Sequence, residues 1–374
     1  MNEQSVGLRH KAQLLCVLAV LAVLAATLWP FNPFPPNGVT WLRRSAGLRF
    51  EKDAVVVSSA PLLPPQNDVE SYTLELLVRP AKVTGSQTIL GFYRPGRTTQ
   101  LLVRQYEDGL LVTRDARIDS DPTKTIKFDV DHVFTMGRLV LVTISFGLDG
   151  TAVFLDGQLA EHIRSFKISR NELSGAELIV GTSPVTFHPW KGDLCGLAIY
   201  AKELTPAGAL EHYKKWMEQD TDWDLKDALA LYDFDGKAAR EVHDKAPARP
   251  NLEIPETFFV PHKEFLRSPA SEFKPNWNYV VDVLLNIAGF VPLGVIVCAY
   301  LLWSTSRRKA ITITTVACAL LSLTIEILQY YIPRRGSGIT DVITNSLGAL
   351  IGAILLQFGW VRRTLEEMKL MRRI

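Results

Sequence analysis

The chain has 374 residues, 47% of them hydrophobic, and a formal net charge of +2. This length allows two domains, and the hydrophobic share is high for a wholly soluble protein. Since the net charge is small and no basic run carries interleaved aromatic residues, no nucleic-acid partner is expected. Only Cys195 of the four cysteines lies in the polar middle of the chain, which excludes a disulfide there and any zinc-type cysteine and histidine spacing.

The first element is an uncharged run, residues 12–29, which follows a basic flank and precedes a proline-rich exit at 30–36. Eighteen apolar residues nearly cross the hydrocarbon core of a bilayer, so residues 1–36 are predicted to hold a cytoplasmic N-terminus and the first transmembrane helix. A cleaved signal peptide is the alternative, because Val23-Leu24-Ala25 suits a cleavage site. In both cases the residues that follow are exported.

Residues 45–262 have a different texture, with short apolar or alternating runs separated by turn residues. This pattern predicts an all-β antiparallel sandwich. Asp149-Gly150 and Asp156-Gly157 are typical of tight hairpin turns. A helix is expected from Pro206, and a strand at 230–235 is expected to close the domain. The strands are expected at 72–78, 88–93, 100–104, 110–114, 140–146, 151–155, 177–181 and 195–200.

This order of strands resembles the laminin-G-like, concanavalin A-like jelly roll. The resemblance rests on the runs 72–80, 142–145, 154–157 and 190–200, followed by Leu204-Thr205-Pro206. It implies a domain that binds glycans or protein partners, in some members with calcium, and that in other members is a hydrolase. The paired glutamates of the glucanases are absent from the predicted strands, so hydrolysis is not expected.

Two weaker sites are expected in this domain. Tyr93, Phe187 and Trp190 are candidates for exposed aromatic rings that stack on sugars, and packing in the core or rim is the alternative. Asp115, Asp119 and Asp121 are candidates for calcium ligands because they cluster in a loop, although a solvated acidic loop explains them equally well. No other cofactor is expected.

After a linker at 263–278, residues 279–358 hold three more apolar runs, at 279–303, 310–331 and 339–358, and residues 359–374 are predicted to form a cytoplasmic amphipathic tail. The basic residues around the first helix, at 306–309 and in the tail then fall on one side of the membrane. The predicted fold is therefore a four-helix transmembrane bundle plus an exported sandwich, in the inner membrane, with both termini cytoplasmic.

Polar residues recur at helical spacing in these last runs, so each set lies on one helix face. With a rise of about 1.5 Å per residue they all fall in the outer half of the membrane. Arg334 and Arg335 lie on the same side, against the positive-inside rule. The polar residues are Asp282, Asn286, Glu326, Gln329, Asp341 and Asn345, and Gly348 and Gly352 share the face of the last pair.

These runs resemble the VanZ-like family of membrane proteins. The matching stretches are 282–294, 322–329, Arg334-Arg335 and 340–348, and the first helix with its Leu28-Trp29-Pro30 exit also fits, so that the sandwich is an insertion between the first and second helices. The family is named for a protein of resistance to the glycopeptide antibiotic teicoplanin. The resemblance implies a place in the cell envelope rather than a reaction.

Three interpretations of the polar set remain open. In the first, the polar residues form hydrogen bonds between helices and serve packing alone. In the second, they form a pocket in which Arg334 and Arg335 bind an anionic headgroup. In the third, they form an enzyme site in which Asp282, Glu326 and Asp341 hold a divalent ion, or one of them acts as a base, on a phosphorylated lipid. We expect binding, with membrane lipid and an envelope glycan or glycoconjugate as partners.

Overall fold

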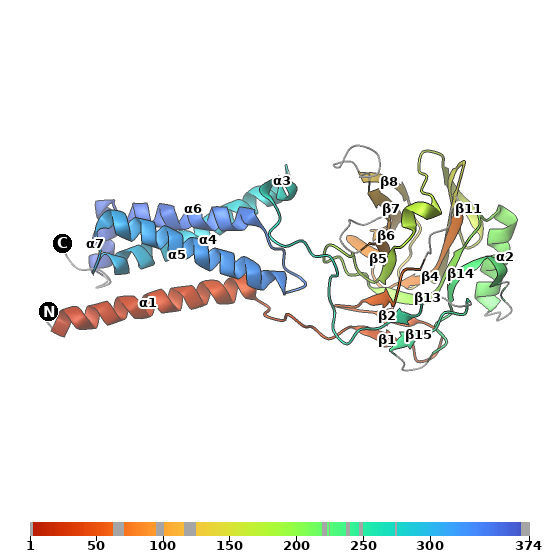
Figure 1. The fold of residues 1–374 in the computed structure, drawn as a ribbon, viewed down its shortest axis with the longest axis horizontal. Coiled ribbons are helices and arrows are strands. Elements are labelled where there is room, and N and C mark those ends of the chain that lie inside the picture. The colour runs from red at the N-terminus through yellow and green to blue at the C-terminus, as the bar shows by residue number, and fades with distance from the viewer. Residues whose placement is uncertain are drawn as a thin grey trace. The chain divides into compact units, whose positions relative to one another are not determined.

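The computed structural model of the protein describes residues 3–62, 71–94, 101–115, 125–218, 223, 225–236, 240–246, 250–273 and 275–367. The chain divides into two compact units. Residues 34–263 form a β sandwich, and residues 1–33 together with 264–374 form a helical bundle. Both predicted kinds of structure are therefore present, as Figure 1 shows.

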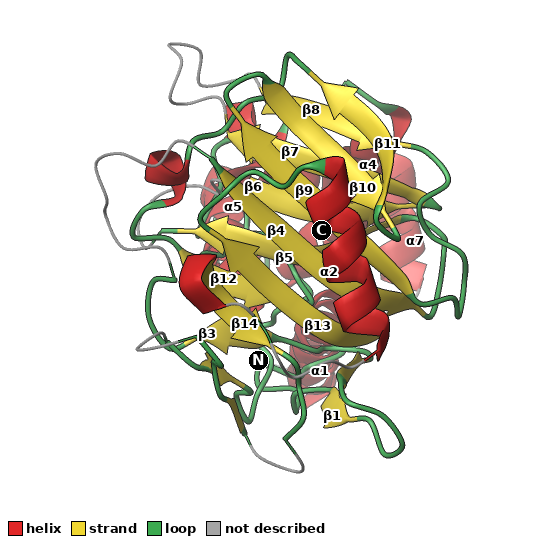
Figure 2. Ribbon diagram, turned by 90° about the vertical axis from the view of Figure 1, so that its right-hand side faces the viewer, coloured by secondary structure: helices red, strands yellow, loops and turns green. Residues whose placement is uncertain are grey.

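The sandwich consists of two antiparallel sheets (Figure 2). The first sheet has the order β1-β2-β13-β4-β9-β10-β11, with β14 also paired to β13, and the second has the order β15-β16-β3-β12-β5-β6-β7-β8. The strands of the first sheet are β1 (Val39–Trp41), β2 (Leu48–Phe50), β13 (Gly192–Tyr200), β4 (Tyr72–Pro80), β9 (Val140–Gly147), β10 (Gly150–Leu155), β11 (Gln158–Ile163) and β14 (Ala228–Tyr232). Those of the second are β15 (Glu241–Val242), β16 (Leu252–Glu253), β3 (Val56–Ser58), β12 (Glu177–Val180), β5 (Ser86–Tyr93), β6 (Leu101–Tyr106), β7 (Gly109–Asp115) and β8 (Thr125–Val130).

Alternation along the strands builds the core between the sheets. In β4, for example, Leu74, Leu76 and Val78 are buried among the core residues. Both predicted hairpins are confirmed: Leu148-Asp149 joins β9 to β10, with Gly150 as the first residue of β10, and Asp156-Gly157 joins β10 to β11 with positive φ at both residues.

Helix α2 (Pro206–Glu218) starts at the predicted proline and covers part of the outer face of the first sheet. Its anchor is Glu75 of β4, which is fully buried. The Glu75 carboxylate accepts a hydrogen bond from Trp216 Nε1 at 2.9 Å and lies 3.0 Å from His212 Nδ1. A buried carboxylate needs such partners, so the pair of contacts fixes α2 to this sheet. Two short 3₁₀ turns, at Arg170–Leu173 and Leu225–Asp227, precede β12 and β14 respectively.

The strand predicted to close the sandwich is not the last one. After β14 the chain crosses to the second sheet and adds β15 and β16 beside β3. This brings the end of the sandwich back to its beginning: Pro36 forms an antiparallel bridge with Thr257, and the Asn37 side-chain amide donates to the carbonyls of Val55 and Pro255. The two ends of the domain are therefore tied to each other.

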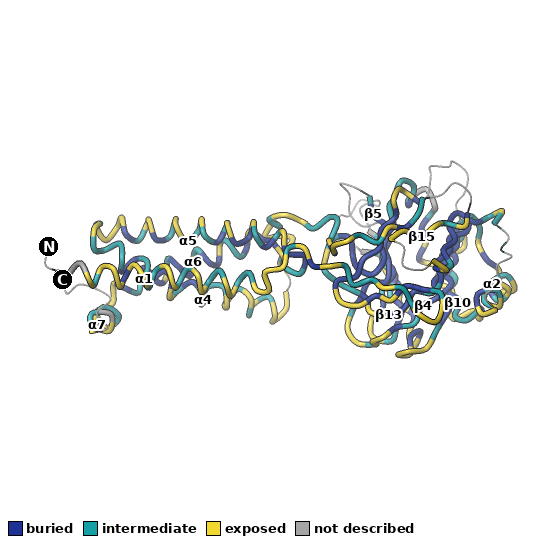
Figure 3. Tube along the Cα trace, turned by 90° about the horizontal axis from the view of Figure 1, so that it is seen from below, coloured by how far each residue is buried: buried dark blue, intermediate teal, exposed yellow. Residues whose placement is uncertain are grey.

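The bundle contains α1 (Glu3–Leu28), α4 (Trp277–Leu301), α5 (Arg307–Tyr330) and α6 (Ile339–Leu355), with the short helices α3 (Pro269–Glu272) and α7 (Gly359–Glu367). By length and composition α1, α4 and α5 can each cross a membrane, and α6 is a shorter apolar helix of 17 residues. Figure 3 shows exposed surface along the outside of these helices, and much of it is apolar, as at Leu18, Leu285 and Leu320. Such surface is suited to lipid.

Glycines bring α4 and α6 into close contact. A Cβ atom at Gly348 would overlap the carbonyl of Ile287, and one at Gly352 would overlap that of Val291. Gly294 of α4 meets the main chain of Ala349 in the same way. Small residues at such positions let the helix backbones touch, as expected for packing in membranes.

Candidate functional site

The polar residues of the bundle gather around the turn between α5 and α6. Glu326, in the last turns of α5, is 1% exposed, and its carboxylate accepts a hydrogen bond from the main-chain N–H of Gly338 at 2.8 Å. Gly338 is the residue that precedes the first turn of α6. A carboxylate at this point satisfies an amide left free at the helix start and meets the positive end of the helix dipole.

A second carboxylate meets the same helix end from the segment before α4. Glu272 of α3 accepts from the main-chain N–H of Thr340 at 3.1 Å and pairs with Arg267 at 3.4 Å. Its side chain is 11% exposed. A Cβ atom at Gly338 would overlap the Glu272 carboxylate, so a larger residue there would displace that side chain.

Residues 263–278 are thus not the simple extended linker that the sequence indicated. The backbone of Arg267 pairs with the loop after α5: its N–H donates to Ser337 O at 3.0 Å and its carbonyl accepts from Ile339 N at 2.9 Å. Ser268 caps α3, with Pro269 at the first helical position. The Ser-Pro pair is a sequence signal for the start of a helix. No sequence signal predicts that this segment docks on the bundle and brings Arg267 and Glu272 into the site.

Asn286 and Asp341 are joined across α4 and α6. Asn286 Nδ2 donates to Asp341 Oδ1 at 2.8 Å, and both side chains are half-buried. The charges of Glu272 and Arg267 act on Asp341 and on Glu326 as well, so these groups form one electrostatic cluster. Asp282 is exposed and interacts with Asp341 by charge only.

Asn345 lies one turn deeper, on the same face of α6. Its Nδ2 donates to Ser322 Oγ at 2.9 Å. Asn345 Oδ1 and the hydroxyl of Thr340 are buried and have no hydrogen-bond partner among the described residues. A buried polar atom left without a partner is costly in an apolar medium, so a ligand or water that bonded to these two atoms would be stabilised here.

Gln329 and Arg335 contact a different helix. Gln329 Nε2 donates to the carbonyl of Thr27 at 2.9 Å, and Arg335 Nη2 donates to that of Trp29 at 2.5 Å. Both carbonyls belong to the end of α1 or the residue after it, where main-chain acceptors lack helical partners. Arg334 is half-buried in the same turn. Of the eight predicted residues, four lie near the start of α6 and two contact the end of α1, whereas Asp282 is exposed and Arg334 lies half-buried in the turn after α5.

Candidate metal ligands were predicted in both the bundle and the sandwich. Within the described part of the chain, no three histidine, cysteine or acidic residues come close enough to hold a metal ion, so Asp282, Glu326 and Asp341 do not gather as a divalent-ion site would need. In the sandwich, Asp119 and Asp121 lie outside the described residues. Asp115 ends β7, but its side chain is not among those described.

The aromatic candidates in the sandwich are mostly buried. For Trp190 and Tyr93 the structure shows the alternative, packing in the core, since they are 0% and 4% exposed. Trp190 Nε1 donates to Gln105 Oε1 at 3.0 Å. The Tyr93 hydroxyl donates to Glu177 Oε2 at 2.8 Å. Burial, together with this hydrogen bond, raises the pKa of Tyr93. Phe187 is half-buried against Phe258. A ring without an open face cannot stack on a sugar.

Two family models match the chain. Residues 51–208 match the model of the concanavalin A-like lectin/glucanases superfamily in its laminin G form, and residues 232–360 match the VanZ/LLP1 model. No curated protein matches the sequence.

Solved structures resemble the sandwich at low sequence identity. A Bacteroides ovatus protein assigned as carbohydrate-binding has 15% identity and a TM-score of 0.40 over 57% of this chain, which spans 58% of that protein. A pentraxin from Limulus polyphemus has 15% identity and a TM-score of 0.33, over 47% of this chain and 78% of its own. The CBM40 of a Ruminococcus gnavus sialidase has 12% identity and a TM-score of 0.33, over 47% and 97%.

The two family matches fall on the two kinds of structure described above, the sheets and the apolar helices. The chain is therefore a membrane protein that combines a VanZ-like helical segment with a laminin-G-like, concanavalin A-like sandwich.

Proposed function

We propose that the VanZ-like bundle recognises an amphiphilic or lipid-linked ligand at the depth of the outer leaflet, and that the sandwich binds an envelope glycan or glycoconjugate. In this proposal the protein lies in the inner membrane with both termini in the cytoplasm and the sandwich outside. The proposed ligand binding by the bundle is supported by one observation. Buried polar groups surround the start of α6, and two of their oxygen atoms, on Asn345 and Thr340, have no hydrogen-bond partner among the described residues.

Packing alone explains part of this set. The hydrogen bonds of Asn286, Glu326 and Gln329 each join two elements of the bundle, and such bonds contribute about 0.6–2 kcal/mol in a membrane. Capping of α6 accounts for the positions of Glu326 and Glu272, but not for the buried polar atoms of Asn345 and Thr340 beside them, which lack partners in the described part of the chain. Ionisable residues at membrane depth are costly and are mostly functional.

Arg334 and Arg335 are the groups proposed to bind the anionic part of the ligand. Arg335 uses one guanidinium N–H on the carbonyl of Trp29, and a guanidinium carries five such donors. A phosphate held by a guanidinium fork gains both charge and geometry. The acids and amides around Asp341 would then orient the polar remainder of the ligand.

The test is mass spectrometry of lipids that copurify with the full chain in mild detergent. The double variant Arg334→Gln/Arg335→Gln is expected to lose an anionic or polyprenyl-linked species. The matched control is Arg308→Gln/Lys309→Gln, which removes the same charge from two exposed residues at the start of α5. Unchanged lipid in the first variant, or equal loss in both, would sink the proposal.

Two other outcomes identify the competing interpretations. A purely structural cluster would lower the thermal stability of the Arg334 and Arg335 variant without changing what copurifies. An enzyme would turn over a phosphorylated lipid in a metal-dependent reaction that disappears in Asp341→Asn.

A further inference from the structure

Three charged side chains form a row on the outer face of the first sheet. Strand β13 runs between β2 and β4, and Asp193 is paired in register with Arg49 on one side and Arg79 on the other. The residues that alternate with them, such as Leu194 and Val78, are buried in the core. By the two-residue period of a strand, the charged row faces away from the core.

The row holds two cations against one anion. Arg49 binds Asp193 through two nitrogens, Nε at 2.8 Å and Nη2 at 3.2 Å, and Arg79 Nη1 lies 3.3 Å from the same carboxylate. The Asp193 side chain is 6% exposed, whereas those of Arg49 and Arg79 are 50% and 36% exposed. Asp193 therefore fixes the two guanidinium groups side by side without neutralising both, and each keeps donors that face solvent.

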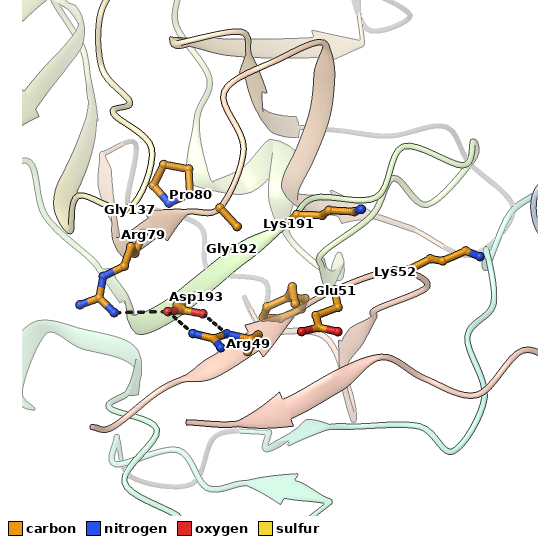
Figure 4. Close-up of a pocket in the computed structure, with 11 residues that line it drawn as sticks. Arg49, Glu51, Lys52, Arg79, Pro80, Gly137, Lys191, Gly192 and Asp193 are labelled. Carbon is orange, nitrogen blue, oxygen red and sulfur yellow. Dashed lines mark hydrogen bonds and ion pairs between the residues drawn. The ribbon is translucent and has the colours of Figure 1, made fainter. Parts of the chain in front are cut away.

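The row lines a cleft of about 460 Å³ (Figure 4). Lys52 and Lys191 line the same cleft, and both are exposed. Neither lysine has an ion-pair partner in the described part of the chain. One further carboxylate, Glu51, lies in the cleft, so four cations face two acids there.

A neighbouring cleft continues the basic surface. It measures about 600 Å³, shares Arg49 and Arg79 with the first, and adds the exposed Arg43 and Arg44. Trp41 of β1 contributes an aromatic ring to its wall. Across both clefts, six cations and two carboxylates surround a groove that contains an indole. Helix α2 packs over the same sheet at Leu77 of β4 and Ala198 of β13.

We propose that this pair of clefts binds the carboxylate or phosphate groups of an acidic glycan. The inference rests on the proposed glycan binding by the sandwich and specifies its site and ligand class. Guanidinium forks match the geometry of carboxylate and phosphate, and exposed ammonium groups add charge without a fixed direction. A neutral sugar would leave the excess cations unpaired, so charge on the ligand distinguishes it from other glycans of similar shape.

The experiment measures binding of oligogalacturonate and of a neutral cello-oligosaccharide to the full chain in detergent, by calorimetry. Lys52→Gln/Lys191→Gln leaves the Asp193 ion pairs intact and is expected to weaken oligogalacturonate binding at least about tenfold. Arg49→Lys keeps the charge beside Asp193 but loses the fork, and is expected to weaken it several-fold.

The matched control is Lys127→Gln/Arg164→Gln. It removes two exposed cations from β8 and from the loop after β11, at the opposite edges of the two sheets from β15 and β1 (Figure 2). This control is expected to bind oligogalacturonate like the unmodified chain. Equal weakening in both double variants, or none in either, would overturn the site.

The two proposals fail in different ways. Binding of the neutral oligosaccharide as tightly as the acidic one, with no effect of the cleft variants, would overturn the acidic class while glycan binding stands. Binding of neither sugar would overturn glycan binding by the sandwich together with this site. Equal binding of duplex DNA, with the same response to the variants, would show a general polyanion surface and overturn the glycan assignment.

Discussion

Trp190 offers a direct test of the difference between a buried core residue and a sugar platform. Its side chain has no exposed surface, lies 5.7 Å from the ring of Phe50 and donates to Gln105 Oε1. Gln105 is itself fully buried and uses its amide nitrogen on the carbonyls of Lys82 and Glu107. Truncation of Trp190 therefore removes a large core side chain and leaves one amide oxygen without its donor.

The expected magnitude follows from these two losses. Trp→Ala in a core costs about 3–5 kcal/mol, and an orphaned buried acceptor costs about 1–3 kcal/mol. Because the effects are not fully additive, Trp190→Ala should lower the free energy of unfolding of the sandwich by about 4–6 kcal/mol, or about 10–20 °C in its Tm. Trp190→Phe keeps most of the ring contact and should lose about 1–3 kcal/mol.

The assay is urea and thermal unfolding of the full chain, with the sandwich transition followed separately from that of the bundle. Tyr106→Ala serves as a control, because that ring is 55% exposed at the end of β6 and its removal should change stability by about 0.5 kcal/mol or less. A loss below about 1 kcal/mol in Trp190→Ala, with a selective loss of sugar binding, would refute the assignment to the core.

Two further predictions concern single residues. Gly348→Ala should push α6 away from the carbonyl of Ile287 and lower the thermal stability of the bundle. Gly289→Ala is the control: a Cβ atom there meets nothing within 4 Å, so the change should be neutral or slightly stabilising. Equal effects of the two variants would contradict the close contact between the helices. Burial raises the pKa of the Cys195 thiol to about 11. At pH 8 its alkylation by iodoacetamide should therefore be slower than that of an ordinary thiol by on the order of a hundredfold, as followed by site-resolved mass spectrometry, and should speed up as the pH rises toward 11. Fast modification at pH 8 would instead show that the thiol is accessible and ionised.

The sequence was informative where a periodic pattern was long. Strands such as β4, β9 and β13 follow apolar runs, and α4 and α5 follow apolar stretches that span a bilayer, so the element type could be read directly. Of the strands that were missed, β11, β15 and β16 carry no such signal. Every residue of β11 is exposed or half-exposed, and β15 and β16 have two residues each, so only pairing with neighbours makes them strands.

The site was predictable in part, for a related reason. Helical spacing placed Asp341, Asn345 and Gly348 on one face, and the structure buries that face against α4 or α5. Arg267 and Glu272 were missed, because a segment rich in proline and charge looks like a tether until it docks. Burial of Trp190 was one of two interpretations that the sequence left open, since an aromatic residue in a turn-rich stretch gives no signal of what covers it.

The contacts that join the two ends of the sandwich affect how the helical bundle assembles. Helices α1 and α4 pack together although residues 34–263 separate them, and Pro36 bridges Thr257 only within the folded sandwich. Once the sandwich has folded, the effective loop between the two helices shrinks from residues 29–276, about 250 residues, to residues 29–36 and 257–276, about 28 residues. By the logarithmic dependence of closure entropy on loop length, this favours their association by about 2 kcal/mol. Folding of the sandwich thus favours the pairing of α1 with α4.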